Sequence, residues 1–401
     1  MINKKNNYEF KKNSMIYMTD INLKYKTVLI RVDFNVVIKN NKIISDTRIR
    51  ASLPTIIYAL KKKAKVILMS HIGRPKEGEY QEKLSMLPIA KYLKKILHKY
   101  NIHFSKTLNI PEFLPGELLI LENVRFNIGE KNNDIQLSKK YAQLCDIFVM
   151  DAFGSAHRKE ASTFGVGFYA KMACAGLLLI SEIQALKKAL KNPQRPMTAI
   201  IGGSKISTKF KLLESLSIIS DIVIVGGGIA NTFLAIENNI GKSLYEPKFI
   251  QLAKKIKNKY NFLIPVDSRV GIEFSNSTPA IIKKPYQINQ NEEIMDIGNQ
   301  SIKNIKNIIK KSKTILWNGP IGVFEFPNFA IGTIELAKSI SMSNAYSIAG
   351  GGETISVIEQ LNIQNKISYI STGGGAFLEF IEGKKLPAIY MLEYFKNNIK
   401  S

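Results

Sequence analysis

Three stretches in the second half of the chain end an apolar run in three consecutive glycines. They are DIVIVGGGIANTF (Asp221–Phe233), SIAGGGETIS (Ser347–Ser356) and ISYISTGGGAFLEF (Ile367–Phe380). Glycine lets backbone N–H groups approach an anion closely, and a helix that begins after the glycines adds the positive end of its dipole. One triple glycine alone is more typical of a turn. Three of them after apolar runs predict a crevice for a phosphate-rich ligand, where Glu353 could hold a divalent cation.

Further residues of the second half fit the same predicted phosphate site. The stretch MTAIIGGSKISTKF (Met197–Phe210) ends an apolar run in two glycines. It continues with Lys205 and Lys209, two cations that can face a phosphate chain. Another apolar run, in TILWNGPIGVFEFPN, is followed by Asn318, Gly319, Pro320 and Glu325.

The first half of the chain carries charged and polar side chains directly after four apolar runs. In chain order they are Arg31, Asp33 and Asn35; His71 and Arg74; Arg125; and Asp151, His157 and Arg158, with Arg48 where a helix is predicted to begin. Each could be structural on its own, as a turn cap, a core histidine or a surface ion pair. Arginines gathered at one sheet edge repel each other unless an anion is present. Together they predict a multiply charged anionic ligand.

These residues imply an α/β architecture that brings them together. Apolar runs alternate with helical stretches, which predicts parallel sheets covered by helices, with ligands at the carboxyl ends of the strands. A chain of 401 residues is long enough for two such domains. We therefore predict an α/β fold with two doubly wound parallel-sheet domains. A long helix over 175–192, ended by NPQRP, is expected to join them.

The net charge of +25 raises a nucleic-acid-binding protein as an alternative. The lysines are spread along predicted helix faces and form no single stripe, so we expect no specific nucleic-acid partner. No apolar run is long enough to span a bilayer, and no membrane association is expected. Cys145 and Cys174 lie in apolar surroundings and are expected to be reduced thiols of a cytoplasmic protein. Residues 1–14 are polar and lysine-rich and are predicted to be a disordered tail.

The ordered motifs resemble those of one enzyme family. RVDFN, SHIGRP, LENVRF, DAFGSAHR, GGSKIS, GGGIANTF, TILWNGPIGVFEFPN, AGGGET and STGGGAFLEFIEGKKLPA are similar, in this order, to phosphoglycerate kinases of the bacterial type. The resemblance covers nearly all of the chain from about Thr27 onward. It implies reversible phosphoryl transfer between 1,3-bisphosphoglycerate and MgADP, giving 3-phosphoglycerate and MgATP in glycolysis.

The same resemblance implies two domains that face each other across a cleft. The phosphoglycerate-binding domain would be 15–184, with the C-terminal segment 386–401 packing back on it, and the nucleotide-binding domain would be 185–385. Mg²⁺ with ATP or ADP is the implied cofactor, small-molecule substrates are the implied partners, and a monomer is the family expectation.

The resemblance also assigns roles to individual residues. The phosphoglycerate site would be formed by Asp33, Phe34, Asn35, Arg48, His71, Ile72, Gly73, Arg74, Arg125 and Arg158. The nucleotide site would be formed by Lys205, Lys209, Gly226, Gly227, Gly228, Asn318, Pro320, Glu325, Gly351, Gly352, Glu353 and Thr354, with Mg²⁺ at Glu353. Gly374 would lie near the transferred phosphoryl group, and with Arg48 and Lys205 it forms the expected catalytic set.

Three positions depart from the family pattern. Val37 stands where the family usually has proline, so that loop lacks a fixed φ. Glu353 replaces the usual aspartate and adds one methylene next to the expected metal. Ser155 replaces threonine and keeps the hydroxyl.

The expected reaction needs no general base. In the direction of ATP use the acceptor is a carboxylate with a pKa of about 4, already ionised at pH 7. Catalysis then requires positioning and charge stabilisation of the moving phosphoryl group, for which Arg48 and Lys205 are the candidates. The domains are expected to close when both substrates are bound, and a rigid, preformed cleft is the alternative. A different α/β kinase or a dinucleotide enzyme is a further alternative that the glycine loops alone would allow.

Overall fold

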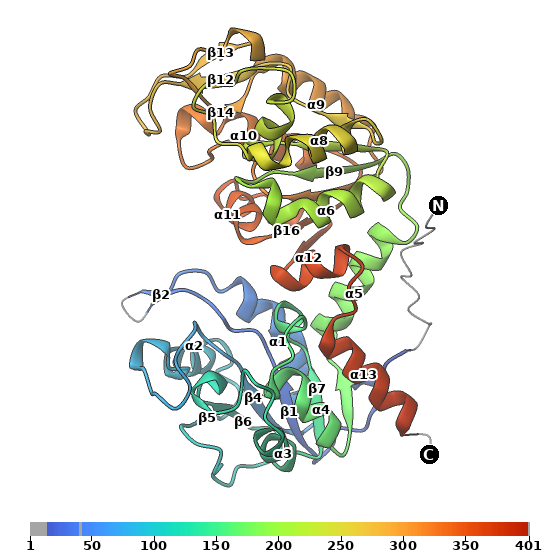
Figure 1. Cartoon of the computed structure of the whole chain (residues 1–401). Helices are drawn as coiled ribbons and strands as arrows, with labels where there is room; N and C mark the ends of the chain where they lie inside the picture. Colours follow the sequence, from blue (N-terminus) through green and yellow to red (C-terminus); the bar gives the residue numbers. More distant parts are fainter. Residues whose placement is uncertain (1–13, 40–41, 400–401) are drawn as a thin grey trace. The chain divides into compact units, whose positions relative to one another are not determined.

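The computed structural model describes residues 14–39 and 42–399, so the predicted tail lies outside it except for Ser14. Over this range the chain divides into two compact units. The first runs to Gln184 and is rejoined by the segment that begins at Lys384, and the second is Ala185–Gly383. The boundary falls inside helix α5 (Leu177–Leu190), within the span of the predicted long helix. Each unit has its own parallel sheet (Figure 1), and each has its own hydrophobic core.

The first unit is built on a six-stranded parallel sheet in the order β5-β6-β4-β1-β7-β8. Its strands are β1 (Thr27–Arg31), β4 (Lys65–Met69), β5 (Ile102–Ser105), β6 (Leu118–Leu121), β7 (Ile147–Met150) and β8 (Ala173–Ala175). Apolar residues are buried on both faces of the central strands, as parallel sheets require. Strands β4, β5 and β6 follow β1 in the chain and lie on one side of it in the sheet. Strands β7 and β8 come later and lie on the other side of β1. A ligand is therefore expected at the carboxyl end of β1, where the winding reverses.

Helices pack on this sheet through regularly spaced apolar residues. They are α1 (Thr47–Lys61), α2 (Leu87–Ile96), α3 (Ile135–Gln143), α4 (Val166–Tyr169) and α13 (Pro387–Asn398), and a hairpin of β2 (Ile38–Lys39) and β3 (Lys42–Ile43) precedes α1. Helix α1 buries Ile49, Ile56 and Leu60 on one face, in the same core as Val28 and Ile30 of β1. This packing fixes the start of α1 beside the carboxyl end of β1.

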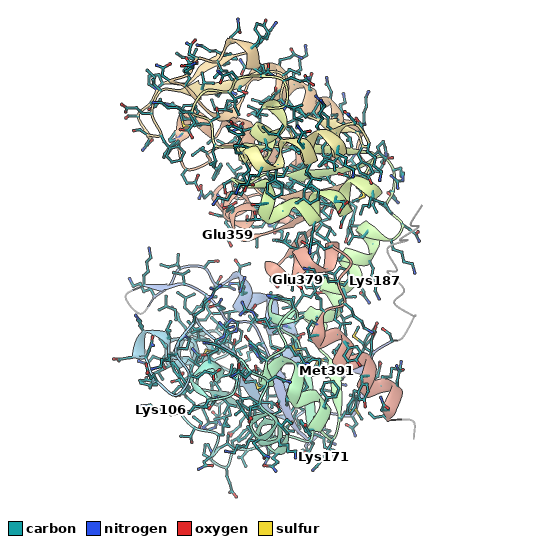
Figure 2. The ribbon with its side chains drawn as sticks, viewed as in Figure 1. Lys106, Lys171, Lys187, Glu359, Glu379 and Met391 are labelled. Atoms are coloured by element: carbon teal, nitrogen blue, oxygen red, sulfur yellow. The ribbon has the colours of Figure 1, made fainter. Side chains whose placement is uncertain are left out.

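Helix α13 returns to the first unit after the second unit is complete. Its Ala388 N–H donates to the Ala156 carbonyl over 3.1 Å, and the helix packs against α4 and β8. Met391, labelled in Figure 2, lies so close to Gly167 that a Cβ on this glycine would be 2.0 Å from the methionine sulfur. A side chain at this position would therefore require Met391 to move.

The second unit has a six-stranded parallel sheet in the order β11-β10-β9-β15-β16-β17. Its strands are β9 (Met197–Ile201), β10 (Ile222–Val225), β11 (Phe262–Leu263), β15 (Thr314–Asn318), β16 (Tyr346–Gly350) and β17 (Tyr369–Ser371). Its helices are α6 (Ile206–Ile219), α7 (Gly227–Leu234), α8 (Ile250–Lys257), α9 (Asn299–Lys311), α10 (Ile331–Ser341), α11 (Gly352–Gln360) and α12 (Gly375–Ile381). Trp317 of β15 lies in the core with Ile305 of α9, Leu336 of α10 and Val357 of α11. The predicted α/β fold with two parallel-sheet domains is confirmed.

The second unit also contains a small antiparallel sheet that the sequence pattern did not predict. Its order is β13-β12-β14, formed by β12 (Ser268–Gly271), β13 (Ile281–Lys283) and β14 (Glu293–Ile297). The register of β12 against β14 shifts between Arg269 and Val270. Such an irregularity interrupts the alternation of apolar and polar residues by which antiparallel strands are recognised.

Asp296 of β14 carries a carboxylate into the interior of the second unit. It accepts the Gly332 N–H at the start of α10 over 2.7 Å and the Ile297 N–H over 2.8 Å. Burial raises the pKa of Asp296 to about 7, against the opposing effect of these hydrogen bonds. The Asp296 side chain thus holds the start of α10, and its burial disfavours the ionised form of the carboxyl group.

Replacing Asp296 with asparagine should flatten the decline of stability between about pH 4 and about pH 7. The folded-state pKa of about 7 lies above the unfolded value of 3.8. In this window the native state therefore keeps a proton that the unfolded state has released, and the free energy of unfolding falls as pH rises. The contribution is at most about 1.4 kcal/mol per unit of pKa difference. Urea denaturation of both proteins at the two ends of the window measures it, and equal declines would contradict the raised pKa.

Candidate active site

Arg48 lies at the start of α1 and is held by the loop that follows β1. Its guanidinium is 3.3 Å from the Asp33 carboxylate and donates to the Asn35 carbonyl over 3.4 Å. The Asn35 side chain accepts the Gly73 N–H over 2.9 Å, which ties this loop to the one after β4. Gly73 has a φ of 60°, a left-handed conformation that glycine adopts without strain. Arg48 keeps 31% of its side-chain surface exposed, so it is both anchored and accessible.

Arg125 and Arg158 share one carboxylate, that of Glu160. Arg125 donates to the Gly73 carbonyl over 2.6 Å and to Glu160 over 3.0 Å, and Arg158 lies 3.6 Å from the same Glu160 oxygen. Burial lowers the pKa of Arg125, and the Glu160 charge opposes this effect. The Nε groups of both arginines are buried and have no hydrogen-bond partner among the described residues. They are donors that an anion could accept from.

His71 lies just beyond β4 and is 2% exposed. Its Nδ1 is 3.2 Å from a guanidinium nitrogen of Arg31, and its Nε2 is buried without a partner among the described residues. Burial is the main cause that lowers the pKa of His71 well below its ordinary value, and the charges of Arg31, Arg125, Arg158 and Arg48 act in the same direction. The imidazole is therefore neutral at pH 7 and adds a polar group to the site without adding charge.

The first unit thus joins most of the residues that the sequence predicted for the phosphoglycerate site. Through the contacts above, Asp33, Asn35, Arg48, His71, Gly73, Arg125 and Arg158 form one arginine cluster at the carboxyl ends of the strands. The side chains of Phe34 and Ile72 lie in the hydrophobic core, so only their backbone groups could reach a ligand. Arg74 has an exposed side chain outside these contacts.

Glu160 also belongs to the cluster and was not among the predicted site residues, and Arg31 was predicted at a strand end without being assigned to the phosphoglycerate site. No motif marks Glu160, because its role depends on two arginines from other parts of the chain. Composition supports the prediction for Arg31, because the 57 basic residues divide into 8 arginines and 49 lysines. In so lysine-rich a chain, an arginine at a strand end indicates a position that needs a planar group with several donors.

In the second unit a pocket of about 330 Å³ lies at the carboxyl ends of the parallel strands. It is lined by Lys209, Asn318, Gly319, Gly351, Gly352, Glu353, Thr354, Gly374 and Leu378. Gly351 has a φ of 101° and directly precedes α11, so the chain turns sharply from β16 into a helix whose first residues line the pocket. This arrangement is typical of a phosphate site.

Hydrogen bonds in the pocket wall fix its polar groups. Thr354 accepts the Gly319 N–H over 2.8 Å and donates to the Gly350 carbonyl over 3.0 Å. The Nδ2 group of Asn318 donates to the same carbonyl over 2.7 Å. The Oδ1 atom of Asn318 is buried and has no partner among the described residues. Lys209 donates to the Gly202 carbonyl over 2.6 Å. Burial lowers the pKa of Lys209, and the charge of Glu353 opposes this.

The remaining residues predicted for the nucleotide site lie outside the lining of this pocket. They are Lys205, Gly226, Gly227, Gly228, Pro320 and Glu325. A Cβ on Gly228 would be 2.1 Å from the Ser204 carbonyl oxygen, so this glycine is needed for the close packing of two loops. The Gly227 N–H already donates to the Ile321 carbonyl over 3.0 Å. Lys205 and Glu325 have exposed side chains. For this group of residues, a contact with a nucleotide stays a prediction.

Known proteins match the chain over nearly its whole length. The family model described as phosphoglycerate kinase matches residues 18–384. Phosphoglycerate kinase of Buchnera aphidicola subsp. Acyrthosiphon pisum (strain Tuc7) is 64% identical over 385 residues, which cover 96% of this chain and 99% of the relative. That of Buchnera aphidicola subsp. Baizongia pistaciae (strain Bp) is 61% identical over 389 residues, covering 97% and 99%. The structure of phosphoglycerate kinase from Coxiella burnetii is similar with a TM-score of 0.88 at 47% identity, covering 94% of this chain and 98% of that one.

The chain belongs to the phosphoglycerate kinase family. It is a phosphotransferase with a carboxyl group as acceptor, and it transfers a phosphoryl group reversibly between 1,3-bisphosphoglycerate and ADP, giving 3-phosphoglycerate and ATP in glycolysis. The resemblance that the motifs carried is confirmed. Among the described residues, no helix combines the length and the apolar character that crossing a bilayer demands.

The residues of the pocket fit a magnesium ion that arrives with the nucleotide. Within the described residues there is no group of three or more His, Cys, Asp or Glu side chains that could hold a metal. Mg²⁺ is commonly bound by one or two protein oxygens and completes its coordination with phosphate oxygens and water. The exposed Glu353 carboxylate and the unpartnered Asn318 Oδ1 line the same pocket and meet this requirement.

Substituting Gly351 with alanine should lower the stability of the ligand-free protein by about 1–3 kcal/mol. Its φ of 101° strains any L side chain, and a Cβ there would be 2.8 Å from Nδ2 of Asn318. Gly352→Ala is the matched control, because a Cβ on Gly352 meets nothing within 4 Å. Thermal unfolding of both variants measures the difference. An equal loss in the two variants would show that the turn before α11 is not the cause.

Proposed function

We propose that 3-phosphoglycerate binds the arginine cluster of the first unit and that the nucleotide binds the pocket of the second. The observation that carries the first assignment is the pair of buried Nε–H groups of Arg125 and Arg158, which have no partner among the described residues. A buried donor without a partner costs free energy, which a bound phosphate or carboxylate recovers through charge-assisted hydrogen bonds. The second assignment is supported by the glycine turn and helix start that line the pocket.

In this proposal the chemical step relies on charge and position. The acceptor carboxylate is ionised at pH 7, so no side chain has to remove a proton. Arg48 is held at its base by Asp33 but remains partly exposed, which suits a group that stabilises the transferred phosphoryl oxygens. Lys205 from the second unit and the backbone near Gly374 are assigned the same task. Gly374 lines the pocket, and its φ of 48° orients the backbone before α12.

Mg²⁺ is assigned to Glu353 together with the nucleotide phosphates, with Asn318 nearby. When bound, the ion would neutralise phosphate charge and favour the departure of the diphosphate. The protein's own part is to hold the phosphate chain by Lys209 and by the backbone around Gly351, independently of the ion.

The proposed setting is a cytoplasmic monomer that acts on small molecules alone. Burial raises the pKa of the Cys145 thiol to about 12 and also raises that of Cys174. Neither thiol is poised for redox chemistry, as expected in a reducing compartment.

The net charge of +25 gives loose attraction to polyanions without a specific nucleic-acid site. A single species of about 45.1 kDa in sedimentation would agree with a monomer, and a larger species would contradict it.

Arg158→Ala and Arg48→Ala should change the kinetics with 3-phosphoglycerate and MgATP in different ways. Arg158 is assigned to the phosphate that is not transferred, so its loss should mainly raise KM for 3-phosphoglycerate. Arg48 is assigned to charge in the transition state, so its loss should mainly lower kcat, by about 100-fold or more. A coupled assay of wild type and both variants tests the roles. A folded wild type without activity would refute the substrate assignment, and equal kcat losses at unchanged KM would refute the division of roles.

Glu353→Gln should raise the Mg²⁺ concentration needed for half-maximal rate. The amide keeps the size of the side chain but removes the charge that attracts the cation. The alternative is an acidic residue that only stabilises the start of α11 through the helix dipole. Titration of the rate with Mg²⁺ at saturating substrates distinguishes the two, because an unchanged half-maximal concentration would support the dipole role.

Ligand binding should change how the two units are placed during the reaction. The proposed substrate sites lie on different units, and direct transfer requires reacting atoms within about 3–3.5 Å. Closure also excludes water that would hydrolyse the donor. We expect the radius of gyration in small-angle scattering to fall most with both 3-phosphoglycerate and a non-reacting MgATP analogue present. The same value in all four ligand states would support a rigid, preformed arrangement.

A further inference from the structure

A continuous line of buried side chains connects Glu130 to His71 in the first unit. The Ser162 hydroxyl donates to Oε1 of Glu130 over 2.5 Å, and the same hydroxyl oxygen accepts Nε–H of Arg31 over 2.8 Å. The far end of the Arg31 guanidinium is 3.2 Å from Nδ1 of His71. All four residues are fully or almost fully buried. We call this line the Glu130 relay.

The donor direction at the step from Arg31 to His71 is fixed by chemistry. A guanidinium has only N–H donors, so Nδ1 of His71 must accept from Arg31. The imidazole is neutral, because burial and four arginines lower its pKa. A neutral imidazole with an accepting Nδ1 carries its one proton on Nε2. That Nε2–H is buried and has no partner among the described residues.

The other groups that contact Glu130 hold it as the fixed end of the relay. The Ser162 backbone N–H donates to its Oε2 over 3.2 Å, and the Tyr141 hydroxyl donates to the same oxygen over 3.3 Å. The Glu130 backbone carbonyl accepts the Ala161 N–H over 2.9 Å, which ties the segment after β7 to the one before α3. Ser162 is therefore placed from both its main chain and its side chain, and it offers Arg31 an acceptor in one orientation.

We propose that Glu130, Ser162 and Arg31 are positioning residues that hold His71 as an Nε2–H donor toward the acceptor substrate. The proposal rests on the assignment of 3-phosphoglycerate to the arginine cluster. The opposite tautomer would turn a lone pair toward an anionic ligand and would leave Arg31 facing an N–H group. The relay excludes this tautomer, so the ligand meets a preorganised donor and no ring has to reorient on binding.

Ser162→Ala tests the relay by removing one oxygen from its middle. Arg31 then loses the acceptor for its Nε–H and keeps only its contact with the Val32 carbonyl, so its guanidinium holds the His71 ring less firmly. The ligand-free protein is labelled with ¹⁵N at its four histidines. In its ¹⁵N spectra we expect wild-type His71 to show a protonated Nε2 and an unprotonated Nδ1. The variant should show averaged shifts at both nitrogens. His71→Asn identifies the resonances.

Kinetics provide the second measurement. Ser162→Ala should raise KM for 3-phosphoglycerate about fivefold or more, with kcat within about twofold and KM for MgATP unchanged, because a lost ground-state donor weakens binding. Ser138→Ala is the matched control: it removes another fully buried hydroxyl of the first unit, whose donation goes to the Asp134 carbonyl. It should leave both the spectrum and KM unchanged. If Ser162→Ala does not fold, Ser162→Cys keeps the shape with a weaker acceptor and should shift both readouts in the same direction.

The outcomes separate this proposal from the proposed function. A protonated Nδ1 in the wild type would overturn the relay outright. The relay would also be overturned if Ser162→Ala only lowered the melting temperature, while the His71 tautomer and the KM for 3-phosphoglycerate stayed as in the wild type. A wild type that fails to phosphorylate 3-phosphoglycerate would refute the substrate assignment, yet the tautomer of the ligand-free protein would still be measurable.

Discussion

Positive charge buried at the edge of a parallel sheet is the constraint on which the first unit depends. Arg31 and Arg125 are almost completely removed from water, and a buried charge without partners would cost several kcal/mol. The loops after the strands are therefore arranged to supply acceptors. Glu160 and the Gly73 carbonyl serve Arg125, and Ser162 serves Arg31. Segments that follow four different strands are thereby held to one another before any ligand arrives.

The proposed nucleotide site of the second unit relies on backbone groups and little buried charge. Glycines allow neighbouring loops to approach closely, as a Cβ on Gly202 would lie 1.8 Å from the Pro320 carbonyl oxygen. The space left above these loops is the pocket, and its walls are hydrogen-bonded through Thr354 and Asn318. A ligand with a long, flexible phosphate chain can use such backbone donors along its length. A compact acid with two fixed charges is better matched by rigid guanidinium groups.

The sequence predicted the parts of this structure that depend on local pattern. The apolar runs form the parallel strands, and Arg125 and Asn318 lie at or after strand ends and Arg48 at a helix start, where the pattern indicated. It did not predict the antiparallel sheet, because a register shift between Arg269 and Val270 breaks the alternation. Nor could it predict Glu160 beside Arg125, or Ser162 beside Arg31, since partners 35 and 131 residues apart meet only in the folded chain. Local pattern reveals which residues can bind an anion, while the residues that hold them in place follow from tertiary contacts.

The charges of the arginine cluster come from groups whose ionisation hardly changes near neutral pH. Guanidinium groups stay protonated well above pH 7 even where burial lowers their pKa, as at Arg125. His71 would be the natural titrating member, but burial and the surrounding arginines keep it neutral. A protonated imidazole would add to the repulsion among the arginines when no anion is bound. A neutral imidazole of fixed tautomer offers a hydrogen bond without that cost. The low pKa of His71 thus comes first from its burial and then from the charges of the arginines that are proposed to bind the acceptor.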